Sequence, residues 1–290
     1  MDIHQKSEWA EYLKKIGWQI DQIDDVYIYC KKIICFGNVI KIQHPRLIDD
    51  KLLNKVIDKY NPAIVIMEGY SNNLSARKEI LSPSPWIFAP TRILTQNIDR
   101  LNHQKSFDKT AKRYINKSKN IGISVEIIDG NSVVDSLKQV QDRFYSLYRE
   151  FSKLRKINRI SKSQFAKKAE AFNKKSVYLF AREKGKDVAS IWAYVDEGSF
   201  VYLNVANTKN SYSTYANYLL IDSALEYCSN LGIKVFDFQM IYDQRFPECF
   251  THSKHYTPFK MHFGSNIVDF DIPKMYIRSR IFRFIVKLLG

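Results

Sequence analysis

The chain has 290 residues, of which 45% are hydrophobic, 14% aromatic and 26% charged. This length accommodates one large domain or two ordinary ones, and the apolar content excludes a disordered or low-complexity protein. With 45 Lys and Arg against 30 Asp and Glu, the formal net charge is +15. A domain this basic should meet nucleic acid, the inner face of a membrane or a phosphorylated substrate, and the charge alone does not choose among them.

The cysteines indicate a reducing compartment. Cys30, Cys35, Cys228 and Cys249 stand singly in mostly apolar surroundings, and no C-x-x-C pair occurs, so we expect reduced thiols. Residues 1–13 lack the apolar core of a signal peptide. No uncharged apolar run reaches the roughly 18 residues that cross a bilayer. We therefore expect a cytoplasmic protein.

The first part of the chain alternates between helical and strand patterns. In chain order the patterns predict a helix over residues 7–14 capped by Ser7, strands over 26–30 and 38–42, a helix over 49–60 and a buried strand over 63–67. Three prolines make residues 82–90 a loop. Beyond it, Asp108 caps a basic helix over 109–119 that stops at Gly122, and a strand follows over 123–128.

The second part repeats this order. The predicted elements are helices over residues 136–154 and 161–173, a meander of strands over 177–181, 188–194 and 200–204, a helix over 213–230 that stops at Gly232, and a strand over 234–238. Strands, a helix and a buried strand thus occur twice, near residues 26–67 and 177–238. This order predicts an α/β or α+β layered domain in two copies.

Common catalytic and metal-binding signatures are absent from the sequence. It has no phosphate-binding glycine loop, dinucleotide fingerprint, zinc-protease helix or nucleophile elbow. His252, His255 and His262 lie close together, but only Glu248 and Cys249 are near them as further ligands. Ordinary surface or core histidines explain this cluster better than a metal site does. We expect no metal and no cofactor.

Two features remain that could carry function. The helix over residues 109–119 is strongly basic, which in isolation is typical of a solvated helix face. Asp237 and Phe238 end a buried strand, and a loop rich in Tyr and His leads from them to a Phe-Lys-x-x-Phe-Gly segment at 259–264. A lysine beside aromatics usually packs its stem and exposes its head.

These segments together resemble a known family. In the first segment, residues 112–123, the basic helix is followed by a Gly and a strand. In the second, an Ala-Asn-x-Leu-Leu helix at 216–220 leads to Gly232 and to a strand that ends in Asp237. The third is the Phe-Lys-x-x-Phe-Gly segment at 259–264. In order and spacing the sequence resembles the FemABX family of peptidoglycan bridge-forming aminoacyltransferases, from Trp9 to about Val268.

The resemblance implies two GNAT-like domains in tandem, with mixed sheets flanked by helices, in agreement with the order of elements read twice. We place the first domain at residues 1–105 and the second at 106–272. Residues 273–290, rich in Lys and Arg among apolar residues, predict a basic amphipathic helix. Such a helix suits an anionic membrane surface, although it could equally pack on the domain.

The activity that the resemblance implies is aminoacyl transfer from aminoacyl-tRNA to the peptide amine of a lipid-linked peptidoglycan precursor. The barrier lies in the tetrahedral oxyanion and in removing a proton from the nucleophile. Resemblance and positive charge assign oxyanion stabilisation to Lys260. Asp237 is predicted to be a polar anchor or base, with a turn carboxylate as the alternative.

The remaining candidates are binding residues. The predicted substrate-binding residues are Phe259, Tyr202, Tyr256, Asn217 and Arg159. Core packing is the alternative for Tyr202, and Arg159 is a loose counterpart of an arginine that holds the acceptor's phosphate in some family members.

Both implied substrates are polyanions, which gives the basic helix a role. Lys112, Arg113 and Lys117 are predicted to contact phosphates of tRNA or of the lipid-linked pyrophosphate, without reading sequence. A lipid-linked acceptor places the predicted protein on the inner face of the membrane.

Two rival functions stay open. An ordinary GNAT enzyme would use acyl-CoA, whose pyrophosphate is usually held by a [QR]-x-x-G-x-[GA] loop at a helix start. Residues 209–216 occupy that place and contain no Gly, which counts against CoA but not against another acyl donor. The second rival is a relative that keeps tRNA or membrane binding and has lost the chemistry.

Overall fold

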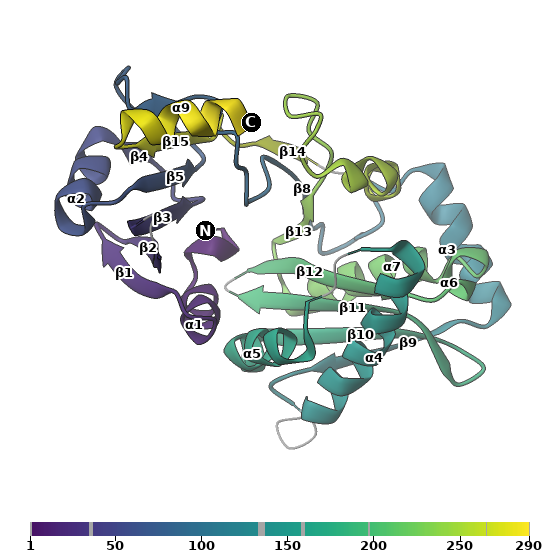
Figure 1. Cartoon of the computed structure of the whole chain (residues 1–290). Coiled ribbons are helices and arrows are strands. Elements are labelled where there is room, and N and C mark those ends of the chain that lie inside the picture. Colours follow the sequence, from purple (N-terminus) through teal and green to yellow (C-terminus); the bar gives the residue numbers. More distant parts are fainter. Residues whose placement is uncertain are drawn as a thin grey trace. The chain divides into compact units, whose positions relative to one another are not determined.

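The computed structural model describes residues 2–34, 37–132, 137–157, 160–196, 198–264 and 266–289. The chain divides into two compact units (Figure 1). Met1–Arg92, Asp243–Cys249 and Val268–Gly290 form the first unit, and Ile93–Tyr242 with Phe250–Ile267 forms the second. The predicted boundaries after residues 105 and 272 differ from these units, because each unit is assembled from segments distant in sequence and local patterns carry no information about such pairing.

The first unit is a sheet with helices on both faces. Its helices are α1 (Ser7–Lys15), α2 (Asp50–Tyr60) and α9 (Arg280–Leu289), and its strands are β1 (Gln19–Ile23), β2 (Val26–Ile33), β3 (Gly37–Gln43), β4 (Ile48–Asp49), β5 (Ile64–Glu68), β6 (Asn72–Asn73), β7 (Ile80–Leu81) and β15 (Lys274–Ile277). The strand order of the main sheet is β1-β2-β3-β5-β15-β7, and β4 pairs with β6. A short 3-10 turn, η1 (Ile3–Gln5), precedes α1.

Alternation along the strands builds two apolar layers in the first unit. Ile40 and Val65 lie in one core cluster with Leu53 of α2. Their sequence neighbours Val39 and Ile64 lie in another cluster with Val286 of α9. Because successive side chains of a strand point to opposite faces, the same strands serve both layers.

The predicted helix over residues 273–290 is wrong in its first part. Residues 274–277 form β15, which pairs antiparallel with β5 in the register Met275↔Ile66 and Ile277↔Ile64. Met275 and Ile277 are fully buried by this pairing. Apolar burial against a distant partner strand outweighs local helical periodicity, so the helix begins only at Arg280.

The second unit is a larger mixed sheet. Its helices are α3 (Lys109–Ile121), α4 (Leu137–Arg155), α5 (Lys162–Phe172), α6 (Asn210–Ser213), α7 (Ala216–Leu231) and α8 (Thr257–Met261), and its strands are β8 (Arg92–Asn97), β9 (Ser124–Asp129), β10 (Ser176–Glu183), β11 (Lys186–Asp196), β12 (Ser199–Asn207), β13 (Val235–Met240) and β14 (Asn266–Asp269). The strand order is β14-β8-β13-β12-β11-β10-β9.

Helices cover both faces of the second sheet. Ile115 of α3 and Leu220 of α7 belong to the apolar core with Ile191 of β11. On α4 and α5, Phe144 and Phe165 pack their rings against Trp192 of the same strand, with ring centroids 6.1 and 5.2 Å apart. Alternate residues of β11 therefore face the two helical layers.

The predicted repetition is confirmed as an architecture. In the first unit β3, α2 and β5 form a parallel strand–helix–strand crossover, and in the second unit β12, α7 and β13 do the same. The sequence patterns missed β1 and β8. They also predicted that the helix corresponding to α7 begins at Ser213. In the structure α7 begins at Ala216, because the residue before it, Tyr215, has the left-handed value φ 55° and interrupts the helix.

A glycine in the closing Phe-Lys-x-x-Phe-Gly segment gives the first testable prediction. Gly264 has φ +71°, and a Cβ there would lie 2.3 Å from the carbonyl oxygen of Ser106. We expect Gly264→Ala to lower the free energy of unfolding by about 1–3 kcal/mol more than Gly185→Ala. Gly185 is the matched control, because its φ is +79° and a Cβ there would meet nothing within 4 Å. Equal losses in urea denaturation would contradict the steric explanation.

Candidate active site in the second unit

The central feature of the second unit is the separation of two parallel strands. β12 and β13 pair only from Ser199↔Val235 to Val201↔Asp237. Beyond that point β12 stays paired with β11 and β13 stays paired with β8. A bulge at Leu203 in β12 and another around Phe238 in β13 accompany the separation. The corresponding strands of the first unit, β3 and β5, remain paired through Gln43↔Glu68.

Lys260 occupies the edge of β13 that β12 leaves. Its Nζ donates hydrogen bonds to the carbonyl oxygens of Phe238, at 2.6 Å, and Met240, at 2.8 Å. Because β12 has separated from β13, no N–H group of β12 is paired with these two carbonyls. A buried acceptor left without a hydrogen bond costs about 1–3 kcal/mol. The lysine therefore both completes the strand edge and brings a titratable amine to it.

Apolar packing fixes the helix that carries Lys260. Phe263 is fully buried, and its ring centroid lies 5.2 Å from that of Phe107 and 6.0 Å from that of Phe238. At the other end of α8, the Thr257 hydroxyl accepts a hydrogen bond from the backbone N–H of Tyr242. The short helix is thus held at both ends, which restricts where the lysine can point.

Burial lowers the pKa of Lys260 to about 7, although the nearby Asp237 carboxylate acts in the opposite direction. The side chain is almost entirely buried, with only 7% of the residue exposed. Desolvation disfavours the charged form of a lysine. An amine that titrates near neutral pH is suited to acid–base or electrostatic catalysis, because both of its protonation states are accessible.

The structure brings Tyr202 and Tyr256 together at Lys260. Nζ lies 5.6 Å from the ring centroid of Tyr202, on β12, and 4.7 Å from that of Tyr256, which precedes α8. Burial raises the pKa of both phenols. Both therefore stay neutral at physiological pH and can donate a hydrogen bond. Of the predicted substrate-binding residues in the described part of the chain, these two lie beside Lys260.

Asp237 is tied into the bulge of β13. Its carboxylate accepts hydrogen bonds from the backbone N–H of Gln239, at 2.6 Å, and from the Gln239 side chain, at 2.8 Å. Gln239 has φ 60°, and the carboxylate stabilises this uncommon conformation. The turn role considered for Asp237 is thus present, and its role as a base stays a prediction.

Two other predicted binding residues have their contacts elsewhere. Phe259 packs toward the core, with its ring 4.9 Å from that of Tyr218 and edge-on to it. Asn217 is half-buried in the first turn of α7. Arg159 lies outside the described residues. The structure therefore brings neither Phe259 nor Asn217 to the lysine.

The cations predicted to bind phosphate are exposed on α3. Lys112, Arg113 and Lys117 all face solvent. The Arg113 guanidinium lies 4.6 Å from the ring centroid of Tyr114, and Lys117 Nζ lies 5.1 Å from that of Tyr215. These two rings stack on each other at 4.2 Å. A surface of cations and stacked aromatics suits a single-stranded nucleic acid.

In the loop where a CoA enzyme would hold pyrophosphate, the backbone N–H groups are hydrogen-bonded to carbonyls of the same loop. The backbone N–H groups of Ser211, Tyr212 and Thr214 donate to the carbonyls of Thr208, Lys209 and Asn210. These amides are already used within the turn. Their internal pairing adds a structural reason against a CoA pyrophosphate cradle at residues 209–216.

The patterns in the sequence could not reveal the carbonyls of Phe238 and Met240 as partners of Lys260. Backbone acceptors have no sequence signature, and the separation of β12 from β13 involves residues about 35 apart. The stacked pair Tyr114 and Tyr215 was also missed, although both residues lie in segments that were singled out.

Lys260 should leave a signature in the pH dependence of stability. Its pKa in the unfolded chain is near 10.5, so between pH 7 and 10 the unfolded state binds a proton that the folded state lacks. Stability therefore rises with pH in this range. We expect the free energy of unfolding to increase from pH 7 to 9 by about 2 kcal/mol more in the wild type than in Lys260→Met.

Urea denaturation at a series of pH values measures this difference, whatever the substitution does to overall stability. Lys254→Met is the matched control, because Lys254 is exposed and lies in the 3-10 turn just before α8. It should keep the wild-type slope. A Lys260→Met slope equal to that of the wild type would show that Lys260 keeps its proton in the folded protein.

Comparisons with known proteins identify the fold. No family model and no curated protein sequence matches the chain. Among solved structures, FemX is similar with a TM-score of 0.75 at 12% identity, over 98% of this chain and 94% of FemX. The C-terminal domain of a protein assigned as a lysylphosphatidylglycerol synthetase in Agrobacterium fabrum gives 0.61 at 12% identity, over 99% and 92%. L-PGS from Bacillus licheniformis gives 0.59 at 11% identity, over 95% and 90%. The predicted fold is confirmed: the chain has a FemX-like, GNAT-like fold.

Proposed function

We propose that this protein transfers an amino acid from aminoacyl-tRNA to the peptide amine of a lipid-linked peptidoglycan precursor. The observation that carries the proposal is the buried Lys260, held by two backbone carbonyls where β12 and β13 separate and flanked by Tyr202 and Tyr256. The FemX-like fold supports the reaction class.

Lys260 has the donors that the transition state requires. An ammonium carries three N–H donors, and the carbonyls of Phe238 and Met240 use two of them. The third can bind the oxygen of the aminoacyl ester as the amine attacks its carbonyl carbon. As the tetrahedral intermediate forms, negative charge develops on that oxygen, and a donor in a water-poor site stabilises it more than it stabilises the substrate. The ester C–O bond then breaks and the tRNA ribose hydroxyl leaves.

The remaining polar groups would handle the protons. The attacking nitrogen must lose a proton and the leaving ribose oxygen must gain one, and the Asp237 carboxylate, on the strand beside Lys260, is the proposed group that takes the proton from the first and passes it to the second. The neutral phenols of Tyr202 and Tyr256 can position the ester by hydrogen bonds. These roles are expectations from charge and placement.

The α3 surface is the proposed contact for tRNA. Lys112, Arg113 and Lys117 would neutralise backbone phosphates, while the stacked rings of Tyr114 and Tyr215 offer apolar surface to a base. Phosphate contacts of this kind make affinity depend strongly on salt and only weakly on sequence.

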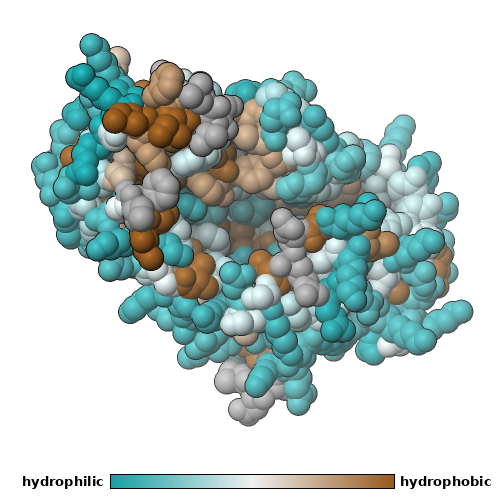
Figure 2. All heavy atoms as spheres, in the orientation of Figure 1, coloured by the Kyte–Doolittle hydropathy of each residue, from teal (hydrophilic) through white to brown (hydrophobic). Residues whose placement is uncertain are grey.

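The proposed location is the inner face of the membrane, where a lipid-linked acceptor resides. In the described part of the chain, no helix is both long and apolar enough to cross a bilayer. On α9, however, Ile281, Phe284 and Ile285 are 76%, 64% and 42% exposed. Figure 2 shows hydrophobic side chains gathered over this helix. With exposed Arg278 and Arg280 beside them, they form a face suited to anionic lipid.

Transfer itself tests the proposal. Incubation with a mixture of charged tRNAs and lipid II, followed by mass spectrometry of the muropeptide, should show addition of one or more amino acids. Lys260→Ala should reduce the rate at least about 100-fold, because an oxyanion donor typically contributes that much. Binding of tRNA should change little, and the exposed Lys254→Ala should behave as wild type.

Other outcomes of these experiments would change the proposed reaction or its acceptor. Equal transfer by Lys260→Ala would end the role given to this lysine. Transfer to phosphatidylglycerol and not to lipid II would move the acceptor to a lipid headgroup, as the name of one similar protein suggests. Micromolar binding of acetyl-CoA in calorimetry would favour an ordinary GNAT enzyme. Binding of tRNA without any transfer would leave a relative that has lost the chemistry.

The membrane contact has its own prediction. Deleting residues 274–290 would remove β15 from the first sheet, so substitutions confined to the exposed face of α9 are the sharper test. The triple variant Ile281→Ser, Phe284→Ser and Ile285→Ser should bind vesicles containing phosphatidylglycerol at least about tenfold more weakly, because the buried apolar area supplies most of the affinity.

A matched triple variant controls for the loss of exposed apolar surface in general. Leu101, Leu231 and Ile121 are 98%, 58% and 45% exposed and lie in the second unit. Their replacement by Ser should leave vesicle sedimentation unchanged. Unaltered sedimentation of the α9 variant would refute the membrane role of this helix.

A further inference from the structure

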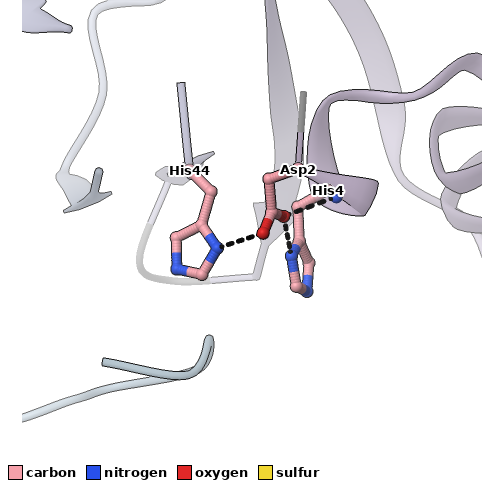
Figure 3. Close-up of side chains that lie close together, drawn as sticks. All are labelled: Asp2, His4 and His44. Carbon is pink, nitrogen blue, oxygen red and sulfur yellow. Dashed lines mark hydrogen bonds and ion pairs between the residues drawn. The ribbon is translucent and has the colours of Figure 1, made fainter. Parts of the chain in front are cut away.

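Two histidines and an aspartate meet in the interior of the first unit (Figure 3). His4 Nδ1 lies 2.6 Å from Asp2 Oδ1, and His44 Nδ1 lies 3.1 Å from Asp2 Oδ2. One nitrogen of each imidazole therefore faces one oxygen of the same carboxylate. One donor atom from each of the three residues lies within 4.8 Å of the other two.

The cluster joins segments that are distant in sequence. Asp2 caps η1, which contains His4, while His44 directly follows β3 and has the left-handed value φ 49°. Gln5 anchors the turn independently, since its side chain donates to the carbonyl of Gln43, at 2.6 Å, and accepts from the backbone N–H of Tyr27, at 2.8 Å. The positions of the two histidines are therefore set by backbone contacts as well as by Asp2.

The cluster is shielded from bulk solvent. Asp2, His4 and His44 are 7%, 7% and 2% exposed. The ring of Phe270 stacks on His44 at 3.9 Å, and the ring of Trp9 meets His4 edge-on at 4.6 Å. An apolar shell around converging imidazole and carboxylate donors is a common setting for a bound metal ion, because it strengthens the bonds and fixes the ligands.

We propose that Asp2, His4 and His44 bind a divalent transition-metal ion, for which Zn²⁺ is the appropriate probe. Two imidazoles and a carboxylate suit zinc and related ions and are a poor set for Mg²⁺ or Ca²⁺, which prefer oxygen donors.

The side chains must rotate to hold the ion. Bonds of about 2.0–2.1 Å to a tetrahedral ion keep neighbouring donors roughly 3.3 Å apart. The His4 imidazole, now 2.6 Å from Asp2, must therefore move away, and donor atoms that lie up to 4.8 Å apart must approach one another, which takes side-chain movements of roughly 1–1.5 Å. Three protein ligands leave one position for water or another small molecule. The ion would tie residues 2–5 to the end of β3 and so stabilise the first unit, independently of the transfer reaction.

The rival interpretation is a hydrogen-bonded Asp–His cluster without metal affinity. Titration of Zn²⁺ into the chelator-treated full-length chain, followed by calorimetry, separates the two. We expect one equivalent to bind with micromolar or tighter affinity. His44→Gln and His4→Gln should each weaken that site by more than about tenfold, and a tenfold excess of Mg²⁺ should not compete.

His255→Gln is the matched control, since His255 is exposed in the second unit. It should bind Zn²⁺ as the wild type does. Circular dichroism checks that each variant is folded, and thermal unfolding gives a second readout, because Zn²⁺ should raise the unfolding temperature of the wild type and of His255→Gln only. Absence of stoichiometric binding, or equal binding by a folded His44→Gln variant, would overturn the metal site. Neither readout involves transfer, so its outcome is independent of the proposed activity.

Discussion

The second unit depends on the hydrogen bonds between Lys260 and the carbonyls of Phe238 and Met240. A parallel pair of strands that separates leaves backbone acceptors exposed on its inner edges, and buried acceptors must be satisfied. Here a lysine side chain supplies the donors that a neighbouring strand would otherwise provide. This interaction thus permits the strands to separate and holds the amine in the interior, where burial lowers its pKa to about 7.

The same crossover in the first unit shows what happens without such a residue. β3 and β5 keep their pairing along the whole of β5, from Ile64 to Glu68, and the strand end is closed by main-chain hydrogen bonds. The side-chain carboxylate of Glu68 there accepts from the backbone N–H groups of Phe88 and Ala89. The two units thus share an architecture, but among the described residues only the second has a lysine between separated strands. The proposed chemistry belongs to the second unit for that reason.

Much of the candidate site could be predicted from the sequence, through two kinds of signal. Local patterns identified the basic helix with its cap at Asp108, confirmed by the hydrogen bond from the Ala111 N–H, and the stop at Gly122. Resemblance singled out Lys260 and Tyr256, which the structure places side by side. Neither signal distinguished Phe259, which packs into the core, from residues at the site, because an aromatic side chain has the same pattern in both settings.

The sequence by itself determined the α/β class, the repeated order of strands and helix, most helix ends and the strong positive charge, because propensity, capping and alternation act over a few residues. Only the tertiary structure decided that residues 274–277 complete the first sheet, that β12 leaves β13 after Val201, and that Asp2 and His4 meet His44. Each of these depends on backbone hydrogen bonds or buried contacts between segments tens to hundreds of residues apart. Their free energy exists only once the chain has closed those loops, and no local pattern encodes it.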